Sequence, residues 1–254
     1  MAKATRTVWR PISNNRNMKA RTARLSLVTM LISVLVCTCA VMQANAAPTF
    51  EPERSSYWHE RSSFFHTFAR EAQVVMVGDS LTDGAEWREM FADQDIVNRG
   101  IDGDTTDGVL ARLDDILDIK PKRVFTMIGI NDFAEAGRSV DDVFANYSAI
   151  VSGLVRRGVK VFVQSTLPCN EAKGAWKSCA GLNPRIGQLN ARLAGLASAT
   201  VTFIDLVPVL TAKGSLKNEF TYDGVHLNGE GYRQWKNAIA PYMPTASKTG
   251  HWTP

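Results

Sequence analysis

The stretch Val74-Val75-Met76-Val77-Gly78-Asp79-Ser80-Leu81-Thr82 decides the fold of this chain. Four apolar residues, most of them β-branched, run directly into Gly-Asp-Ser. This is typical of a short strand that is buried on both faces and ends in a turn. A serine at that point lies between a strand's carboxyl end and a helix, where ligands bind in open α/β sheets. Gly-Asp-Ser is also ordinary turn chemistry, so the stretch alone does not make Ser80 a nucleophile.

Strand-like and helix-like patterns alternate after this stretch. Short apolar runs predict strands at residues 74–77, 95–98, 123–128, 160–165 and 201–205. Apolar residues at helical spacing predict helices at residues 81–91, 106–117, 141–156, 184–196 and 231–242. Five β-then-α units predict an α/β fold, with a parallel sheet covered by helices on both faces and joined by right-handed crossovers.

The first 46 residues differ from the rest of the chain. Residues 1–24 contain seven Lys or Arg and no acid, residues 25–42 are uncharged and largely apolar, and Ala44-Asn45-Ala46 follows. This order predicts a signal peptide cleaved after Ala46 and an exported protein, periplasmic or secreted, with no membrane span after cleavage. Two alternatives stay open: translation that starts at Met18, and an uncleaved anchor, for which the apolar run is long enough.

Removal of this segment changes the charge and the cysteine count. The chain's net charge of +4 becomes −3, because 22 Lys and Arg remain against 25 Asp and Glu. With no basic cluster left, the sequence does not indicate a nucleic-acid partner. Cys169 and Cys179 remain, and in an exported protein they predict one disulfide, the alternative being two free thiols. A metal site would need further ligands near them, and none is evident.

Polar residues follow several of the predicted strands. Ser80 follows the first strand, Gly100 lies in the loop 98–106 after the second, and Asn131 lies in the loop 129–132 after the third. Asp223 and His226 occupy the last loop, before the final helix. All parallel strands end at the same edge of a sheet, so we expect these residues to converge there.

These residue types suit acyl transfer by a serine. Ser80 needs a base within hydrogen-bond reach, and histidine, here His226, is the side chain that most often serves as general base. Asp223 would fix the imidazole tautomer. Donors for the tetrahedral oxyanion would be the N–H groups of Ser80 and Gly100 and the amide of Asn131. Each element alone has an ordinary interpretation as a loop residue, a turn glycine or a helix cap.

Together, the four blocks resemble those of the SGNH (GDSL-type) hydrolases. They are Gly78-Asp79-Ser80-Leu81, the block around Gly100, Gly129-Ile130-Asn131-Asp132 and Asp223-Gly224-Val225-His226. The resemblance runs from about residue 74 to 242. It implies a three-layer α/β/α flavodoxin-like sandwich with a five-stranded parallel sheet of order 2-1-3-4-5. It also implies ester hydrolysis without a metal or organic cofactor, by the triad and oxyanion hole named above.

The sequence predicts four parts of the chain. We expect a signal peptide over residues 1–46, an N-terminal extension with a helix packing on the domain over 47–72, the hydrolase domain over 73–245 and a tail over 246–254. The segment 98–106 and the turn Leu167-Pro168 look most like the branch of platelet-activating-factor acetylhydrolases and carbohydrate acetylesterases. The insert 169–183 should overhang the active edge, where Trp176 would contact substrate.

The insert is short and polar, unlike an apolar lid, which favours a small acyl group on a polar carrier. The sequence therefore predicts a secreted esterase for small, acetyl-type esters on a carbohydrate. Alternatives are a lysophospholipase or broad short-chain esterase, and an O-acetyltransferase, which must exclude water. Outside the enzymes, the alternative is a glycan-binding protein that kept the fold and lost activity. The sequence leaves the natural substrate and the oligomeric state open.

Overall fold

Five parallel strands form the central sheet, in the order β2-β1-β3-β4-β5. They belong to a computed structural model that describes residues 54–92, 95–173 and 179–244. The strands are β1 (Val74–Gly78), β2 (Ile96–Gly100), β3 (Arg123–Met127), β4 (Lys160–Gln164) and β5 (Val201–Ile204). Their bounds lie within two residues of those predicted, and the strand order and fold class predicted for the chain are confirmed.

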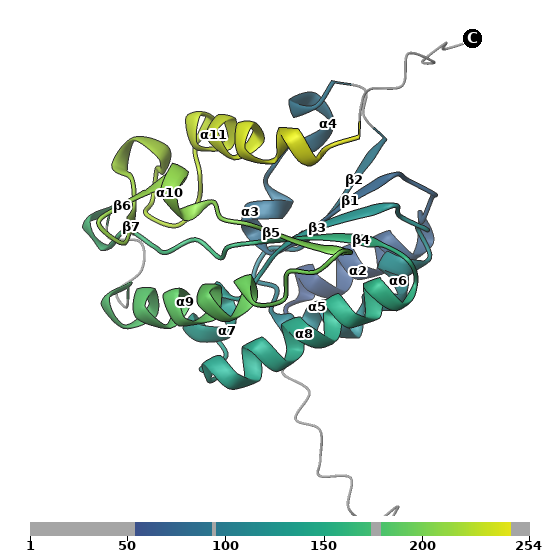
Figure 1. Cartoon of the computed structure of the whole chain (residues 1–254), viewed down its shortest axis with the longest axis horizontal. Coiled ribbons are helices and arrows are strands. Elements are labelled where there is room, and N and C mark those ends of the chain that lie inside the picture. The colour runs from purple at the N-terminus through teal and green to yellow at the C-terminus, as the bar shows by residue number, and fades with distance from the viewer. Residues whose placement is uncertain (1–53, 93–94, 174–178, 245–254) are drawn as a thin grey trace, which may run out of the picture. The chain divides into compact units, whose positions relative to one another are not determined.

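Helices cover both faces of this sheet. Three of them lie on one face: α5 (Thr106–Ala111), α8 (Val140–Arg156) and α9 (Cys179–Ala194) (Figure 1). On the other face lie α4 (Trp87–Met90) and α11 (Gly229–Ile239) (Figure 1). The remaining helices are α2 (Ser56–Thr67), α3 (Ser80–Asp83), α6 (Leu113–Leu117), α7 (Ile130–Ala134) and α10 (Val207–Leu210). A small hairpin, β6 (Thr211–Ala212) with β7 (Ser215–Leu216), follows α10.

Strand β1 shows how the core is divided between the two faces. Val75 and Val77 pack in the cluster formed with α8 and α9, whereas Val74 and Met76 pack in the cluster that includes Trp235 of α11. All four β1 side chains are at most 1% exposed. Because successive strand residues point to opposite faces, a central parallel strand must be apolar at every position. This is why the opening stretch reads as a continuous apolar run.

The prediction of one continuous helix over residues 81–91 is wrong, because the chain forms two short helices there, α3 and α4. Gly84 ends α3 with its N–H on Ser80 O. The Asn98 side-chain amide then donates to the carbonyls of Thr82, Asp83 and Ala85. Those carbonyls are satisfied by β2 instead of by a continuing helix, so the turn stays open.

The helix predicted over residues 106–117 is likewise split, into α5 and α6, at Arg112. The Arg112 side chain turns inward to pair with Asp104, and both side chains are 1% exposed. Helix α9 begins at Cys179, five residues before the predicted start, and contains Pro184. Helix α11 begins at Gly229 because Asn228 caps it, and a 3-10 turn, Ala240–Tyr242, ends it.

Helix α2 lies where the sequence predicted a helix before the first strand. The Ser55 hydroxyl caps it by accepting from Trp58 N. Trp58 and Phe65 are buried with Ile101, the residue that follows β2 and Gly100. Phe64 and Phe68, on the other side, are 51% and 63% exposed. The helix therefore contacts the domain at the loop that follows β2.

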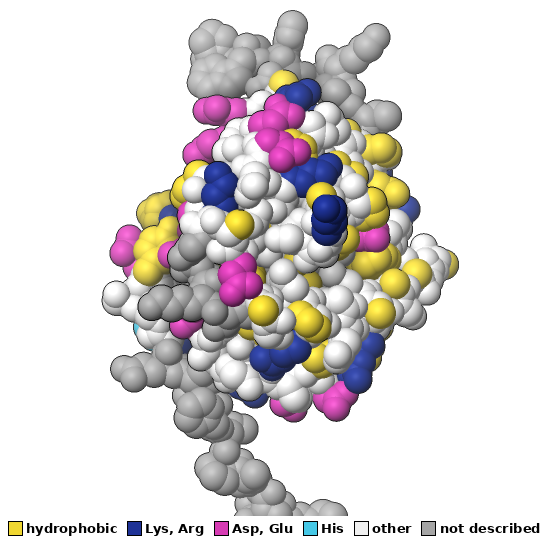
Figure 2. Space-filling view, turned by 90° about the vertical axis from the view of Figure 1, so that its left-hand side faces the viewer, with side chains coloured by type: hydrophobic (Ala, Val, Ile, Leu, Met, Phe, Trp, Pro, Cys, Tyr) yellow, Lys and Arg dark blue, Asp and Glu magenta, His cyan; other side chains and the backbone are white. Residues whose placement is uncertain are grey.

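The described surface shown in Figure 2 carries both signs of charge. On the face that Figure 2 shows, charged side chains of both signs are interspersed with hydrophobic ones among the described residues. That face therefore carries no field of a single sign. Within the part of the chain that the structure describes, no helix has the length and apolar character needed to cross a membrane. The predicted signal peptide and tail, residues 1–46 and 246–254, lie outside the described residues.

Candidate active site

Ser80 stands at the junction of β1 and α3. Asp79 caps α3, since its Oδ1 accepts from Leu81 N at 3.1 Å, and Ser80 is the helix's first residue. Gly78 ends the strand, and a Cβ there would lie 2.2 Å from Thr82 Oγ1 and 2.3 Å from Met127 O. Only glycine fits this crossing, so Gly-Asp-Ser is a strand-to-helix turn that presents the Ser80 hydroxyl at the carboxyl edge of the sheet.

Three side chains from distant parts of the chain form one hydrogen-bonded series. Ser80 Oγ lies 2.9 Å from His226 Nε2, and His226 Nδ1 lies 2.7 Å from Asp223 Oδ2. The side chains of His226 and Asp223 are 28% and 27% exposed, so solvent and small molecules reach them. The sequence separation between Ser80 and His226 is 146 residues, and the parallel sheet brings the two together.

Asp223 is held by more than the imidazole. Its Oδ1 accepts from the N–H groups of Val225 and His226, at 2.9 and 2.8 Å. Burial raises the pKa of Asp223, but the hydrogen bonds from His226 and Val225 outweigh it and bring the pKa below its ordinary value. Asp223 is therefore an ionised acceptor, which orients Nδ1–H of His226 and leaves Nε2 to accept from Ser80.

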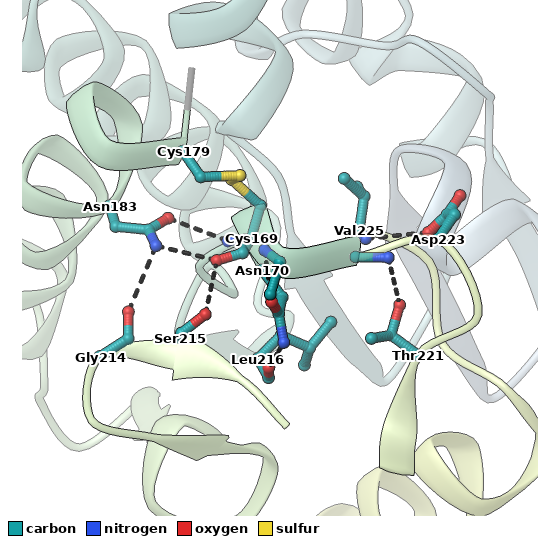
Figure 3. Close-up of a disulfide and its surroundings, with 12 residues drawn as sticks. Cys169, Asn170, Cys179, Asn183, Gly214, Ser215, Leu216, Thr221, Asp223 and Val225 are labelled. Atoms are coloured by element: carbon teal, nitrogen blue, oxygen red, sulfur yellow. Dashed lines mark hydrogen bonds between the residues drawn. A yellow bond between two sulfur atoms is a disulfide. The ribbon is translucent and has the colours of Figure 1, made fainter. Parts of the chain in front are cut away.

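The insert after β4 supports the loop that carries Asp223 and His226. Asn170 N donates to Gly224 O at 2.7 Å, and a Cβ on Gly224, where φ is +95°, would lie 2.4 Å from Asn170 O. Thr221 closes the loop by donating from Oγ1 to His226 O and accepting from Gly224 N. The insert's first residues thus contact the active edge (Figure 3).

Cys169 and Cys179 form a disulfide at the base of this insert (Figure 3). The Asn183 side chain accepts from Cys169 N and donates to Cys169 O, at 2.9 and 2.8 Å. Ser215 of the hairpin also donates to Cys169 O. The disulfide and these bonds tie the insert to α9 and to the hairpin. Trp176, predicted to contact substrate, lies outside the described residues.

The candidate oxyanion donors are placed differently from one another. The Ser80 N–H is in the first turn of α3, where backbone N–H groups lack an intrahelical acceptor. Asn131 lies in α7 and is 4% exposed, and its Nδ2 donates to Asp104 O at 3.0 Å. An amide nitrogen carries two hydrogens, so this bond leaves one available. Both groups remain candidate donors.

The structure does not support Gly100 as the third donor. Its N–H already donates to Asn98 Oδ1 at 2.8 Å. A Cβ on Gly100 would lie 2.2 Å from Asp83 N, so this glycine permits the close contact between β2 and α3. Gly103, in the same loop, is exposed, has φ of +73° and has open space around its Cα. Sequence reasoning named Gly100, and it could not foresee that the Asn98 side chain occupies the N–H of this glycine.

A buried group of carboxylates lies behind the site, and sequence reasoning missed most of it. Asp79, Asp104 and Asp132 are each at most 2% exposed. Asp104 pairs with Arg112, and Asp132 accepts from the N–H and hydroxyl of Thr106. Burial, with a smaller contribution from the other carboxylates, raises the pKa of Asp79 to about 7, and burial raises that of Asp132 to about 6.

The raised pKa of Asp79 links stability to pH. The unfolded carboxyl has a pKa of 3.8, so its stabilising contribution is complete below that pH and is lost as pH rises through about 7. We expect Asp79→Asn, whose Oδ1 can still accept from Leu81 N, to flatten the fall in Tm between pH 5 and 8. The linked free energy is on the order of 2 kcal/mol, or about 5 °C.

Thermal unfolding at several pH values measures this effect. Asp114→Asn, which removes an exposed carboxylate on α6, is the matched control and should leave the slope of Tm against pH unchanged. Equal slopes in the wild type and Asp79→Asn would contradict the linkage.

Within the described ranges, no three His, Cys, Asp or Glu side chains lie close enough together to hold a metal ion.

Known proteins are similar to this chain over much of its length. The sequence profile of the GDSL-like lipase/acylhydrolase family matches residues 76–234. Platelet-activating factor acetylhydrolase IB subunit alpha1 of Bos taurus is 32% identical over 173 residues, which cover 64% of this chain and 71% of that protein. Platelet-activating factor acetylhydrolase IB subunit alpha2 of Rattus norvegicus is 30% identical over 172 residues, with 64% and 72% covered.

Solved structures show the same fold. A GDSL-like lipase from Bacteroides thetaiotaomicron has a TM-score of 0.64 and 25% identity, and the match covers 73% of this chain and 96% of that one. An acetyl xylan esterase has a TM-score of 0.52 over 66% of this chain and 98% of that one; at 21% identity it shows the fold alone. This chain belongs to the GDSL-like lipase/acylhydrolase family and is a serine hydrolase that acts on ester bonds.

Proposed function

We propose that this protein hydrolyses small acyl esters, acetyl esters above all, on carbohydrate carriers, with Ser80, His226 and Asp223 as its catalytic triad. The observation that carries the triad is the continuous series of 2.9 and 2.7 Å contacts from Ser80 Oγ through His226 to Asp223. This is the arrangement that activates a serine, which is otherwise a weak nucleophile.

The reaction proceeds in two halves. His226 Nε2 takes the proton from Ser80 Oγ as the oxygen attacks the ester carbonyl carbon, and the imidazolium then gives that proton to the leaving alkoxide. The product alcohol departs and the acyl group remains on Ser80. Water then attacks the acyl-enzyme with His226 again as base, and the acid is released as the Ser80 hydroxyl forms again. Asp223 stabilises the imidazolium in both halves.

The tetrahedral intermediate of each half carries an oxyanion. We assign two of its donors to Ser80 N–H and to the second hydrogen of Asn131 Nδ2. In place of Gly100, whose N–H is engaged with Asn98, we assign the third donor to Gly103 N–H. Gly103 directly precedes Asp104, whose carbonyl accepts from Asn131, so it belongs to the part of the loop that reaches the amide. One such donor typically supplies about 10²–10³ in turnover.

The substrate assignment rests on the surface beside His226. Tyr222 is 66% exposed, and its ring stacks on His226 at 6.0 Å between centroids and 18° between planes. An exposed aromatic face next to the base offers a platform for the apolar face of a sugar ring. The names of the relatives also point to acetyl esters, since both are platelet-activating factor acetylhydrolase subunits.

Replacement of Tyr222 tests the platform. We expect Tyr222→Ala to raise KM for an acetylated glycan about three- to tenfold, because a stacking contact contributes about 0.5–1.5 kcal/mol. The kcat for nitrophenyl acetate should stay within about twofold. Phe68→Ala, which removes a similarly exposed ring directly after α2, is the control and should leave both values unchanged. An unchanged KM for the glycan in Tyr222→Ala would remove Tyr222 from the substrate site.

We also propose export. Residues 1–46 would be the cleaved signal peptide, 47–72 the extension that contains α2, 73–245 the hydrolase domain and 246–254 a tail. The support is the basic, apolar and Ala-x-Ala order of the first 46 residues. The disulfide between Cys169 and Cys179 suits an oxidising compartment. Mass spectrometry of protein recovered from a bacterial periplasm would detect cleavage after Ala46.

Acyl-length preference is the experiment that decides the function. The purified protein should hydrolyse nitrophenyl acetate with a kcat/KM at least tenfold above that for nitrophenyl octanoate. It should also release acetate from at least one member of a panel of acetylated polysaccharides. A preference for octanoate would favour the lysophospholipase alternative. Faster transfer of acetyl groups to a glycan acceptor than to water would favour the acetyltransferase alternative.

A further inference from the structure

Helix α2 lies outside the residues that match the family profile, 76–234, yet one of its side chains reaches the loop beneath Asn131. We propose that Trp58 is a positioning residue, which acts through Asp104 to hold the oxyanion side of the active site. The inference rests on the proposed role of Asn131 as an oxyanion donor. It extends the functional unit of this chain to a helix that none of the four sequence blocks contains.

A hydrogen bond joins Trp58 to Asp104. Trp58 is 9% exposed, and its indole Nε1–H donates to Asp104 Oδ1 at 2.9 Å. The same oxygen accepts from Thr105 N at 2.9 Å. Arg112 Nε and Nη2 donate to the other oxygen, Oδ2, at 3.0 and 2.8 Å. A buried carboxylate is costly unless it is paired and fully hydrogen-bonded, and the indole supplies one of its four donors.

The Asp104 carboxylate has no room to move toward α5. A Cβ on Gly108 would lie 1.8 Å from Asp104 Oδ1 and 3.0 Å from Trp58 Nε1. Gly108 is therefore the residue that lets α5 pass beside this hydrogen bond. The Asp104 side chain is confined between Trp58 on one side and α5 and Arg112 on the other. Its position is set jointly by α2 and α5.

A further hydrogen bond joins Asp104 to Asn131. The Asp104 carbonyl accepts from Asn131 Nδ2 at 3.0 Å, which uses one amide hydrogen and fixes the direction of the other. A second contact runs in the opposite direction, since Thr106 N and Oγ1 donate to the side chain of Asp132. The loop 104–106 and helix α7 are thus joined at two successive residues. A shift of Asp104 would turn the amide that we assign to the oxyanion.

Packing alone does not account for the choice of tryptophan. Trp58 also belongs to a small apolar cluster with Phe65 and Ile101, which a phenylalanine could serve as well. The hydrogen bond to Asp104 requires the indole N–H. Since oxyanion donors act in the transition state, loss of this bond should lower kcat and leave KM nearly unchanged. A side chain with only a packing role would lower Tm and leave kcat unchanged.

The test is Trp58→Phe in the full-length protein, assayed with nitrophenyl acetate. We expect kcat to fall about 5- to 20-fold with KM within about twofold, because the Asn131 amide is misplaced and not removed. Trp235→Phe is the matched control. Trp235 is likewise a buried indole that donates to a side-chain oxygen, that of Gln164, but it lies in α11 and its acceptor lies in β4. It should lower Tm while kcat stays within about twofold.

A double-mutant cycle with Asn131→Ala identifies the route. If Trp58 acts through Asn131, Trp58→Phe lowers kcat less than about twofold once the amide is absent. Full additivity of the two losses, or an unchanged kcat in Trp58→Phe, would overturn the inference. The Ser80→Ala variant distinguishes this result from a failure of the proposed function. Hydrolysis that persists in Ser80→Ala refutes the triad. Ser80-dependent hydrolysis with a normal kcat in Trp58→Phe refutes only the role of Trp58.

Discussion

Ser80→Ala is expected to lower kcat for nitrophenyl acetate by about 10⁴- to 10⁶-fold, the largest effect of any single substitution in this protein. The substitution removes the oxygen that attacks the ester and leaves His226 without a nucleophile to activate. Residual hydrolysis would come from attack of water on the ester while the oxyanion donors stabilise the tetrahedral intermediate. Steady-state hydrolysis, followed at enzyme concentrations high enough to detect a 10⁵-fold loss, measures the effect.

The same variant should remain folded. The Ser80 side chain is half-buried and bonds to His226, whereas the cap of α3 is made by Asp79. We therefore expect Tm within about 2 °C of the wild type, since substitutions of this kind change stability by about 0.5 kcal/mol or less. A fluorophosphonate should label the wild type on Ser80 and should not label the variant. Undiminished turnover by folded Ser80→Ala would exclude Ser80 as the nucleophile.

Much of the fold could be predicted from the sequence because its signals are periodic and local. Five apolar runs separated by amphipathic helices predict a parallel sheet with right-handed crossovers, whereas the strand order 2-1-3-4-5 was implied only by the resemblance to the SGNH hydrolases. The meeting of Ser80 and His226 could also be predicted, since the ends of parallel strands share one edge. That prediction needed no knowledge of side-chain positions. The structure places the two side chains in contact at 2.9 Å, at that shared edge.

The parts that could not be predicted depend on side chains that turn inward. Arg112 looks like a surface residue of a long helix, and it breaks that helix because its guanidinium pairs with Asp104. The amide of Asn98 likewise accounts for the break after α3 and occupies the Gly100 N–H. No periodicity marks such pairs, because each joins two residues whose distance is fixed only by the assembled sheet. Trp58 was missed for the same reason.

Asp223→Asn is expected to lower kcat about 10⁴-fold at neutral pH, with little loss of stability. Asparagine keeps one carbonyl oxygen, which can still accept from the N–H groups of Val225 and His226 as Asp223 Oδ1 does. The loop geometry should therefore persist. In place of Oδ2, however, an NH₂ group would face His226 Nδ1, and a donor cannot accept from Nδ1–H.

The imidazole would respond by changing its tautomer. With Nδ1 as the acceptor of the new amide, the proton moves to Nε2, and Nε2 can no longer accept from Ser80 Oγ, 2.9 Å away. Catalysis should recover partly at high pH, where hydroxide can replace the blocked base. Rate against pH for Asp223→Asn, with the Tm of the same samples as control, measures this. An Asp223→Asn enzyme with a kcat within tenfold of the wild type at pH 7 would mean that another carboxylate orients His226.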